Sequence, residues 1–320
     1  MLARRIVLAV VLLLAAGPAS AEDADFAAWL EALKQEALAA GIQPATVARA
    51  LDGIEPIPRV IELDRRQPEK VRTYEDYLEH VVSADRQRAA REQLARNRAL
   101  LDAVGQRYGV QPRFIVALWG IETSYGADPG RFPVIGALAT LAYEGRRGPF
   151  FRAELVNALR IVDQDGIDPA ELQGSWAGAM GQAQFMPSTF LTYAVSYSGD
   201  GKRDIWHRRE DVFASMANYL AQSGWRADQT WGRVVRLPAN FDASLLGIGV
   251  TKTLKEWRAL GVRRSDGGPL PVKDLTASVL RPGGEEGRAI LVYDNFRALL
   301  KWNNSSYFAS AVGFLADSME

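Results

Sequence analysis

One carboxylate in this sequence falls on the apolar face of a predicted helix, where it could act as an acid. Ile115, Leu118 and Glu122 occupy positions i, i+3 and i+7 of the segment 114–126, so they share one helix face. The carboxyl group of Glu122 would lose hydration there, which raises its pKa and keeps it protonated near neutral pH. A neutral carboxylic acid is what a general acid needs to protonate a leaving oxygen. A glutamate that points into solvent or caps nearby backbone would occupy the same position.

A second segment, residues 174–190, combines neutral hydrogen-bonding groups with aromatic rings. Ser175 and Gln184 suit hydroxyls and amides, while Trp176 and Phe185 offer apolar surfaces. A sugar presents both hydroxyls and apolar ring faces, so this segment is a candidate glycan-binding site. A tightly packed helical hairpin without a ligand would show the same glycine- and alanine-rich pattern.

The composition excludes several other kinds of chemistry. None of the 320 residues is cysteine, which excludes disulfides, thiolate nucleophiles and cysteine-ligated metals. The only histidines are His80 and His207, too few for a multi-histidine metal site. Basic and acidic residues number 38 each, so the chain lacks the basic surplus of a nucleic-acid-binding protein. Any catalysis is therefore expected to depend on carboxylates.

The first 21 residues have the pattern of a secretory signal peptide. Arg4 and Arg5 precede an apolar run, residues 6–16, and the small residues 17–21 complete an A-x-A ending. The run is short for a membrane span, although a retained amino-terminal anchor would show the same pattern. Removing the leader takes away two arginines and leaves 36 basic against 38 acidic residues. We expect an exported, soluble protein without a permanent membrane anchor, periplasmic where the cell has two membranes.

The elements that must position these residues are mostly helices. Helical spacing predicts helices over about residues 26–41, 44–51, 74–108, 111–126 and 296–315, with short helices and turns over 130–225. Residues 54–68 contain three prolines and are predicted to form an extended surface linker. The β-branched runs 234–237, 277–280 and 289–293 predict a small sheet of about three strands. The fold class is therefore mainly α, with a small β insertion.

A series of motifs in this order resembles the lytic murein transglycosylase B family, which is glycoside hydrolase family 103-like and cleaves bacterial peptidoglycan. The matching motifs are residues 120–126, 137–141, 174–190, 198–201, 217–220, 224–225, 294–296 and 301–307. They extend over about residues 25–317, almost the whole chain that follows the leader. Motifs of this length and order are far more specific than a lone short pattern.

The resemblance implies a lysozyme-like helical core with an additional α segment and a small β subdomain. Residues 1–21 would be the signal peptide and 22–317 the catalytic region. Within that region the implied parts are a mostly helical α segment over 22–110, the core over 111–225 and 296–317, and the β subdomain over about 230–295.

By resemblance, the protein binds peptidoglycan glycan strands and cleaves the β-1,4 bond between N-acetylmuramic acid and N-acetylglucosamine without adding water. Glu122 would protonate the glycosidic oxygen and then take a proton from the 6-hydroxyl of the sugar, which closes a 1,6-anhydro ring. The N-acetyl group of the substrate would supply the nucleophile, so neither a second carboxylate nor a cofactor is required. The alternatives are a hydrolytic muramidase and a non-catalytic glycan-binding module.

The resemblance also implies which residues contact the sugar. The implied substrate-binding residues are Ser175, Gln184, Tyr219, Asn303, Arg147 and Tyr125. Arg146 and Arg147 form a basic pair that would meet carboxylates of the muramyl unit, although a solvated charged turn accounts for the pair equally well. Trp302 stands where the family often has tyrosine, so a hydroxyl contact is expected to be lost there.

Residues 196–204 resemble a calcium-binding loop, which some members of the family possess. The candidate ligands are Ser198, Asp200 and Asp211. The loop departs from the calcium pattern, since Ser196 holds the first position and His207 the twelfth. Calcium is therefore an optional structural ion at most, and no protein partner can be named.

Overall fold

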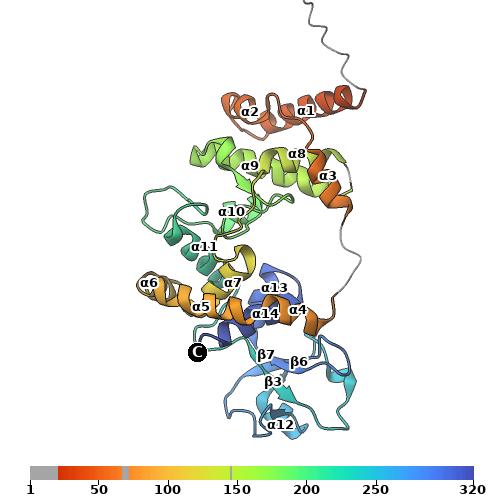
Figure 1. Cartoon of the computed structure of the whole chain (residues 1–320), viewed down its shortest axis with the longest axis vertical. Coiled ribbons are helices and arrows are strands. Elements are labelled where there is room, and N and C mark those ends of the chain that lie inside the picture. Colours follow the sequence, from red (N-terminus) through yellow and green to blue (C-terminus); the bar gives the residue numbers. More distant parts are fainter. Residues whose placement is uncertain (1–20, 67–71, 145) are drawn as a thin grey trace, which may run out of the picture.

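Helices stack one upon another along the long axis of the molecule (Figure 1). The computed structural model describes residues 21–66, 72–144 and 146–320. The leader predicted over residues 1–21 lies, except for Ala21, outside these ranges. The α-helices are α1 (Ala21–Ala39), α2 (Pro44–Leu51), α3 (Pro58–Arg65), α4 (Tyr74–Val81), α5 (Ala84–Arg96), α6 (Arg98–Tyr108), α7 (Pro112–Thr123), α8 (Val134–Glu144), α9 (Gly148–Asp165), α10 (Pro187–Tyr193), α11 (Arg209–Gln222), α12 (Leu254–Ala259), α13 (Asp294–Trp302) and α14 (Ser306–Asp317).

Two predictions about the helices are wrong. The extended linker predicted over residues 54–68 is interrupted by a helix, because Pro58 opens α3 at its first turn, where the missing proline N–H is not needed. Residues 67 and 68 of that prediction lie outside the described residues. Residues 74–108 are three helices instead of one. The hydroxyl of Ser83 accepts from the backbone N–H of Arg86 and caps α5, and Asn97 separates α5 from α6.

Helix α7 lies at the centre of the helical part. Residues 114–120 are all buried, and α7 packs against α14, α5, α6 and α11. Helices α8 and α9 pack against each other farther along the axis, between α7 and the α1–α2 pair (Figure 1). Since α7 is held on several sides, the residues at its end have a fixed position.

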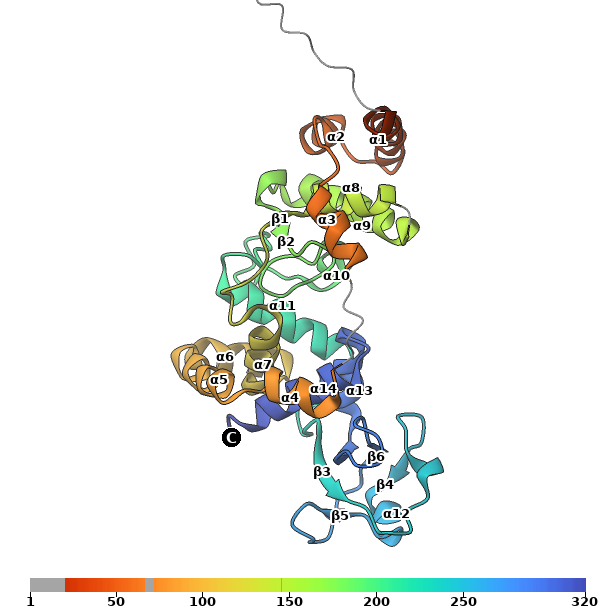
Figure 2. The ribbon, with the colours of Figure 1, turned by 45° about the vertical axis from the view of Figure 1, so that its right-hand side comes forward.

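A five-stranded antiparallel sheet with α12 forms the end of the molecule opposite α1 and α2 (Figure 2). Its strands, in the order β4-β6-β7-β3-β5, are β3 (Gly232–Arg236), β4 (Lys252–Thr253), β5 (Arg263–Arg264), β6 (Thr276–Leu280) and β7 (Ala289–Val292). Ile290 and Val292 face the main helical core, whereas Ala289 and Leu291 face a second core around Trp257. The mainly α fold with a small β subdomain is thus confirmed.

The three predicted strands correspond to β3, β6 and β7. Strands β4 and β5 have two residues each, which is too short to give a period-2 pattern. A further two-stranded ladder joins β1 (Phe132–Pro133) to β2 (Gln173–Gly174) and leads the chain into the 174–190 segment.

Candidate active site

The end of α7 sets the position of Glu122. The helix stops at Thr123, and Ser124, Tyr125 and Gly126 follow with φ of 49°, 63° and 81°. Left-handed backbone is costly for non-glycine residues and persists only where the surroundings enforce it. In the described part of the chain, the only other non-glycine residue with positive φ is Gln184, at 49°. All three strained non-glycine residues therefore lie in the two segments singled out by the sequence.

The carboxyl group of Glu122 has one hydrogen-bond donor from a distant helix. The indole Nε1 of Trp302 donates to Glu122 Oε1 over 2.7 Å. Burial raises the pKa of Glu122 from an ordinary 4.5 to about 7, and the bond from Trp302 opposes that rise. A glutamate with this pKa is protonated in a large fraction of molecules at neutral pH and can act as an acid and then as a base. Its catalytic role itself stays a prediction.

Trp302 is fixed by an aromatic cluster. Its ring lies 4.7 Å from the ring of Tyr219 and 5.3 Å from that of Phe185, measured between centroids. Tyr219 is buried, and its hydroxyl donates to Lys301 O over 2.5 Å. Tyr219, predicted to contact the sugar, therefore lies behind Trp302 and holds the end of α13. At position 302, where a hydroxyl contact was expected to be lost, the indole N–H donates to Glu122.

Gln182 joins the 174–190 segment to α7. Its Oε1 accepts from Trp119 Nε1 over 2.9 Å, and its Nε2 donates to Trp206 O over 2.6 Å. The hydroxyl of Thr123 lies 3.2 Å from Gln182 O and donates to it. A Cβ at Gly126 would fall 2.4 Å from Gln182 Oε1, so glycine is required there. These contacts bring the segment that carries Ser175 and Gln184 to the end of α7 that carries Glu122.

Ser175 and Gln184 each use part of their hydrogen-bonding capacity within the protein. Ser175 Oγ accepts from the backbone N–H of Ala179 over 3.1 Å, which leaves its hydroxyl proton to donate. Gln184 Nε2 donates to Pro129 O and to Gly181 O, both over 2.9 Å. Both side chains are partly exposed and remain predicted sugar contacts.

Tyr125 is partly buried, whereas Asn303 is exposed. The Tyr125 hydroxyl donates to Arg86 O over 2.8 Å, and its ring packs edge-on against Trp119. Tyr125 thus ties α5 to the end of α7. Asn303 follows α13 directly and is exposed, so its amide is accessible from solvent.

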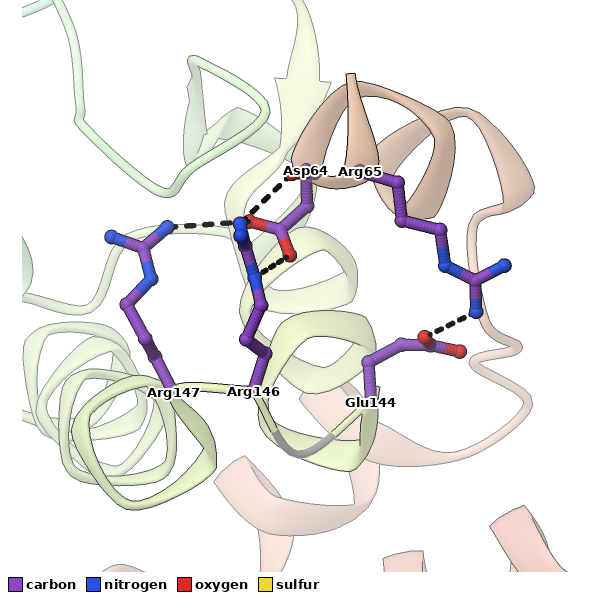
Figure 3. A network of polar contacts seen from close by, with 5 residues as sticks. All are labelled: Asp64, Arg65, Glu144, Arg146 and Arg147. Atoms are coloured by element: carbon purple, nitrogen blue, oxygen red, sulfur yellow. Dashed lines mark hydrogen bonds and ion pairs between the residues drawn. The ribbon is translucent and has the colours of Figure 1, made fainter. Parts of the chain in front are cut away.

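Arg147 already contacts the carboxylate of Asp64 within the protein (Figure 3). Arg146 contacts both carboxylate oxygens of Asp64, at 3.0 and 2.6 Å, and also donates to Asp64 O. Arg147 makes one longer contact, 3.3 Å from Asp64 Oδ1, and its guanidinium lies 4.8 Å from the ring centre of Phe151. Arg65 and Glu144 form a second ion pair between α3 and α8. Arg146 thus ties α8 and α9 to α3 through three bonds, whereas Arg147 makes a single contact with Asp64 and keeps free donors.

In the candidate calcium loop, the carboxylate oxygens already accept hydrogen bonds from the protein. Asp200 Oδ1 accepts from Ser196 Oγ and Lys202 N, and Oδ2 pairs with Arg208 Nη1 over 2.6 Å. The bond to Arg208 is the main reason that the pKa of Asp200 lies well below its usual range. The two oxygens of the fully buried Asp211 accept from the backbone N–H groups of residues 197 and 204.

Calcium needs six to eight oxygen ligands, so this arrangement does not fit the ion. Within residues 21–66, 72–144 and 146–320, no group of three or more His, Asp or Glu side chains could hold a metal. The calcium ligands Ser198, Asp200 and Asp211 stay a prediction that the geometry does not favour.

Sequence reasoning missed Tyr77, which lies near Glu122. Burial raises the pKa of Tyr77, and the negative charge of Glu122 adds to the rise. Its ring lies 5.7 Å from that of Tyr307. Tyr74, Tyr77, Leu78 and Val81 repeat at three and four residues, so the amphipathic pattern of α4 could have indicated that Tyr77 faces inward.

The helical core, the attached sheet and a single carboxyl group in an aromatic niche define a lysozyme-like protein with one candidate acid. The chain belongs to the transglycosylase SLT domain family, which it matches over residues 25–317. The family resemblance and the lysozyme-like fold predicted from the sequence motifs are thereby confirmed.

The chain is also similar to a lytic transglycosylase of Escherichia coli. The chain is 35% identical over 224 residues to the membrane-bound lytic murein transglycosylase B of Escherichia coli K12, covering 68% of this chain and 60% of that protein. The aligned part thus spans less than two thirds of the relative's length.

Two solved structures from Pseudomonas aeruginosa are also similar. SltB3, solved with NAG-anhNAM-pentapeptide, is 49% identical with a TM-score of 0.89, over 92% of this chain and 79% of that one. The soluble lytic transglycosylase SltB1 is 29% identical with a TM-score of 0.81, over 91% and 98%.

Proposed function

We propose that this protein is a peptidoglycan lytic transglycosylase. It cleaves the β-1,4 bond between N-acetylmuramic acid and N-acetylglucosamine and leaves 1,6-anhydro-muramyl ends. Glu122 gives its proton to the glycosidic oxygen as the bond from the anomeric carbon breaks. The resulting carboxylate then takes the proton of the muramyl 6-hydroxyl, whose oxygen bonds to the anomeric carbon. Because the substrate supplies this oxygen, no water enters the product.

The observation that carries the proposal is the state of Glu122. Its pKa of about 7 lets the same carboxyl group give and take a proton near neutral pH. Burial and the bond from Trp302 both act on that pKa, and neither is a second carboxylate. An ordinary glycosidase would need a second carboxylate about 5–10 Å from the first.

The substrate class is supported by the site and by the relatives. SltB3 was solved with NAG-anhNAM-pentapeptide and with NAG-NAM-pentapeptide. In this chain, partly exposed Ser175 and Gln184 lie in the segment joined to α7, and Arg147 offers free donors to carboxylates of the muramyl unit. Together these groups match the hydroxyls, amides and acids of peptidoglycan.

The proposed location is the periplasm. The leader pattern of residues 1–21 supports export. Within the part of the chain that the structure describes, no helix is both long and apolar enough to cross a membrane.

Mass spectrometry of the products from purified peptidoglycan tests the proposal, with wild type beside Glu122→Gln. Anhydro-muramyl products that disappear in the variant are the expected result. Reducing-end products would instead indicate a hydrolytic muramidase. A folded wild-type protein that binds the glycan and releases nothing would indicate a binding module.

A further inference from the structure

The contact between Trp302 and Glu122 is asymmetric. Indole Nε1 is a donor with no acceptor capacity, and it donates to Oε1 of the carboxyl group over 2.7 Å. In a neutral carboxyl group the carbonyl oxygen is the better acceptor, so the indole favours Oε1 as the carbonyl oxygen. The acidic proton is then left on Oε2.

We propose that Trp302 is a positioning residue that decides which oxygen of Glu122 carries the catalytic proton. The inference rests on the proposed function for its catalytic consequence, but not for the proton placement itself. With the proton on Oε2, the acid carries it on the oxygen that does not accept from Trp302. A tyrosine hydroxyl at position 302 would lack this effect, because it can accept a hydrogen bond as well as donate one.

The surrounding cluster keeps the indole in one orientation. The rings of Tyr219 and Phe185 lie against it, and the Tyr219 hydroxyl holds the backbone of Lys301, its neighbour in the chain. The N–H direction is therefore set by packing on α11 and by residue 185, and not by Glu122 alone. This is the kind of support that a precisely oriented acid requires.

The other titratable groups around the site are Tyr77 on α4, Arg86 on α5, Tyr219 on α11, Tyr307 on α14 and Tyr125 beyond α7. Burial raises the pKa of Tyr77, Tyr125 and Tyr219, which therefore stay neutral, and arginine stays charged. A pH-dependent signal from Trp302 between about pH 4 and 9 would thus report Glu122.

The NMR resonances of the tryptophan indole N–H groups test the contact between Trp302 and Glu122 without any substrate. In protein labelled with ¹⁵N-tryptophan, the Trp302 signal is identified by its loss in Trp302→Phe. We expect its N–H resonance to titrate with a midpoint near 7, the pKa of Glu122, and to stop titrating in Glu122→Gln.

Two other tryptophans serve as internal controls. Trp231 Nε1 donates to Asp317 over 2.9 Å, and burial raises the pKa of Asp317 to about 6, so Trp231 should titrate too. Trp225 donates to the neutral Gln111 Oε1 over 2.8 Å and should not. A flat Trp302 resonance beside a titrating Trp231 would overturn the proposal, whatever the protein does to peptidoglycan.

Enzyme kinetics then test whether Trp302 affects catalysis by Glu122. Trp302→Phe keeps the aromatic packing but removes the donor that lowers the pKa of Glu122. We expect kcat to fall about ten-fold with KM little changed, and the alkaline limb of the pH profile to move upward. Trp302→Tyr should restore the limb's position, since it restores a donor, but not the full kcat, since a hydroxyl can also accept a hydrogen bond and so does not fix the proton on Oε2. A fall in kcat with an unmoved pH profile would mean that Trp302 is merely structural, and the seven other indole signals check that each variant is folded.

Discussion

The ring of Tyr125 lies directly over the backbone of Gly120. A Cβ atom at position 120 would fall 2.5 Å from Tyr125 Cε1, closer than real Cβ contacts. Gly120 lies inside α7, where glycine is less favourable than alanine by about 1 kcal/mol. Glycine is thus an unfavourable residue for the helix at this position, but it leaves room for the ring of Tyr125, three residues after Glu122.

We predict that Gly120→Ala destabilises the protein and impairs the site. The added methyl group would displace Tyr125 and cost about 1–3 kcal/mol, which exceeds the gain in helix propensity. Chemical denaturation should show a net loss of up to about 2 kcal/mol. Gly249→Ala is the matched control, because no atom lies within 4 Å of a Cβ there. Equal stability of the two variants would contradict the packing argument.

Replacing the acid should stabilise the fold at neutral pH. The pKa of Glu122 is raised in the folded state, so ionisation favours the unfolded chain, and stability is lost as pH rises from about 4.5 to about 7. Glu122→Gln removes this loss and keeps an acceptor for Trp302. We expect its advantage over wild type to be near zero at pH 4 and to reach about 3 kcal/mol above pH 7. Denaturation curves at the two pH values measure it, and a constant difference would refute the assignment.

Loss of the Asp64 charge should loosen the attachment of α3. Asp64 is buried, and the bonds from Arg146 hold its pKa below the usual range. Its contribution is therefore present above about pH 4 and disappears as pH falls through the folded-state pKa. Because Arg146 is half exposed, we expect Asp64→Asn to cost about 1 kcal/mol at pH 7. Asp85→Asn, which breaks an exposed pair with Arg88, should have almost no effect.

Calcium should leave the thermal stability unchanged. The carboxylates of Asp200 and Asp211 already have cationic or N–H partners within the loop. Adding calcium or a chelator should therefore not move Tm, whereas a bound ion would raise it with concentration. Arg208→Gln offers a second test: if Arg208 takes the place of a metal, calcium should begin to stabilise this variant.

The sequence predicted the parts of the fold whose signals are local. Helical periodicity and Pro112 located α7, and the spacing of Ile115, Leu118 and Glu122 anticipated the raised pKa. Helix α3 was missed because Pro58 was taken as a breaker, although proline suits the first turn of a helix.

Contacts between residues far apart in the sequence could not be predicted from local sequence patterns. Trp302 lies 180 residues from Glu122 in the sequence, and no periodicity connects them. The family pattern suggested only a lost hydroxyl at this position, and the folded chain shows that the indole N–H donates to Glu122. The sugar-binding assignment of Tyr219 likewise could not show that its ring is buried behind Trp302.

The chain reaches Glu122 at the carboxyl-terminal end of α7. Glu122 lies in the last turn of the helix, where the aligned peptide dipoles leave a partial negative charge of about half an electron. That charge opposes a carboxylate and favours its protonated form. In the first turn of the same helix, the glutamate would instead be favoured as an anion. The element that carries the acid to the site thus also helps it to keep its proton.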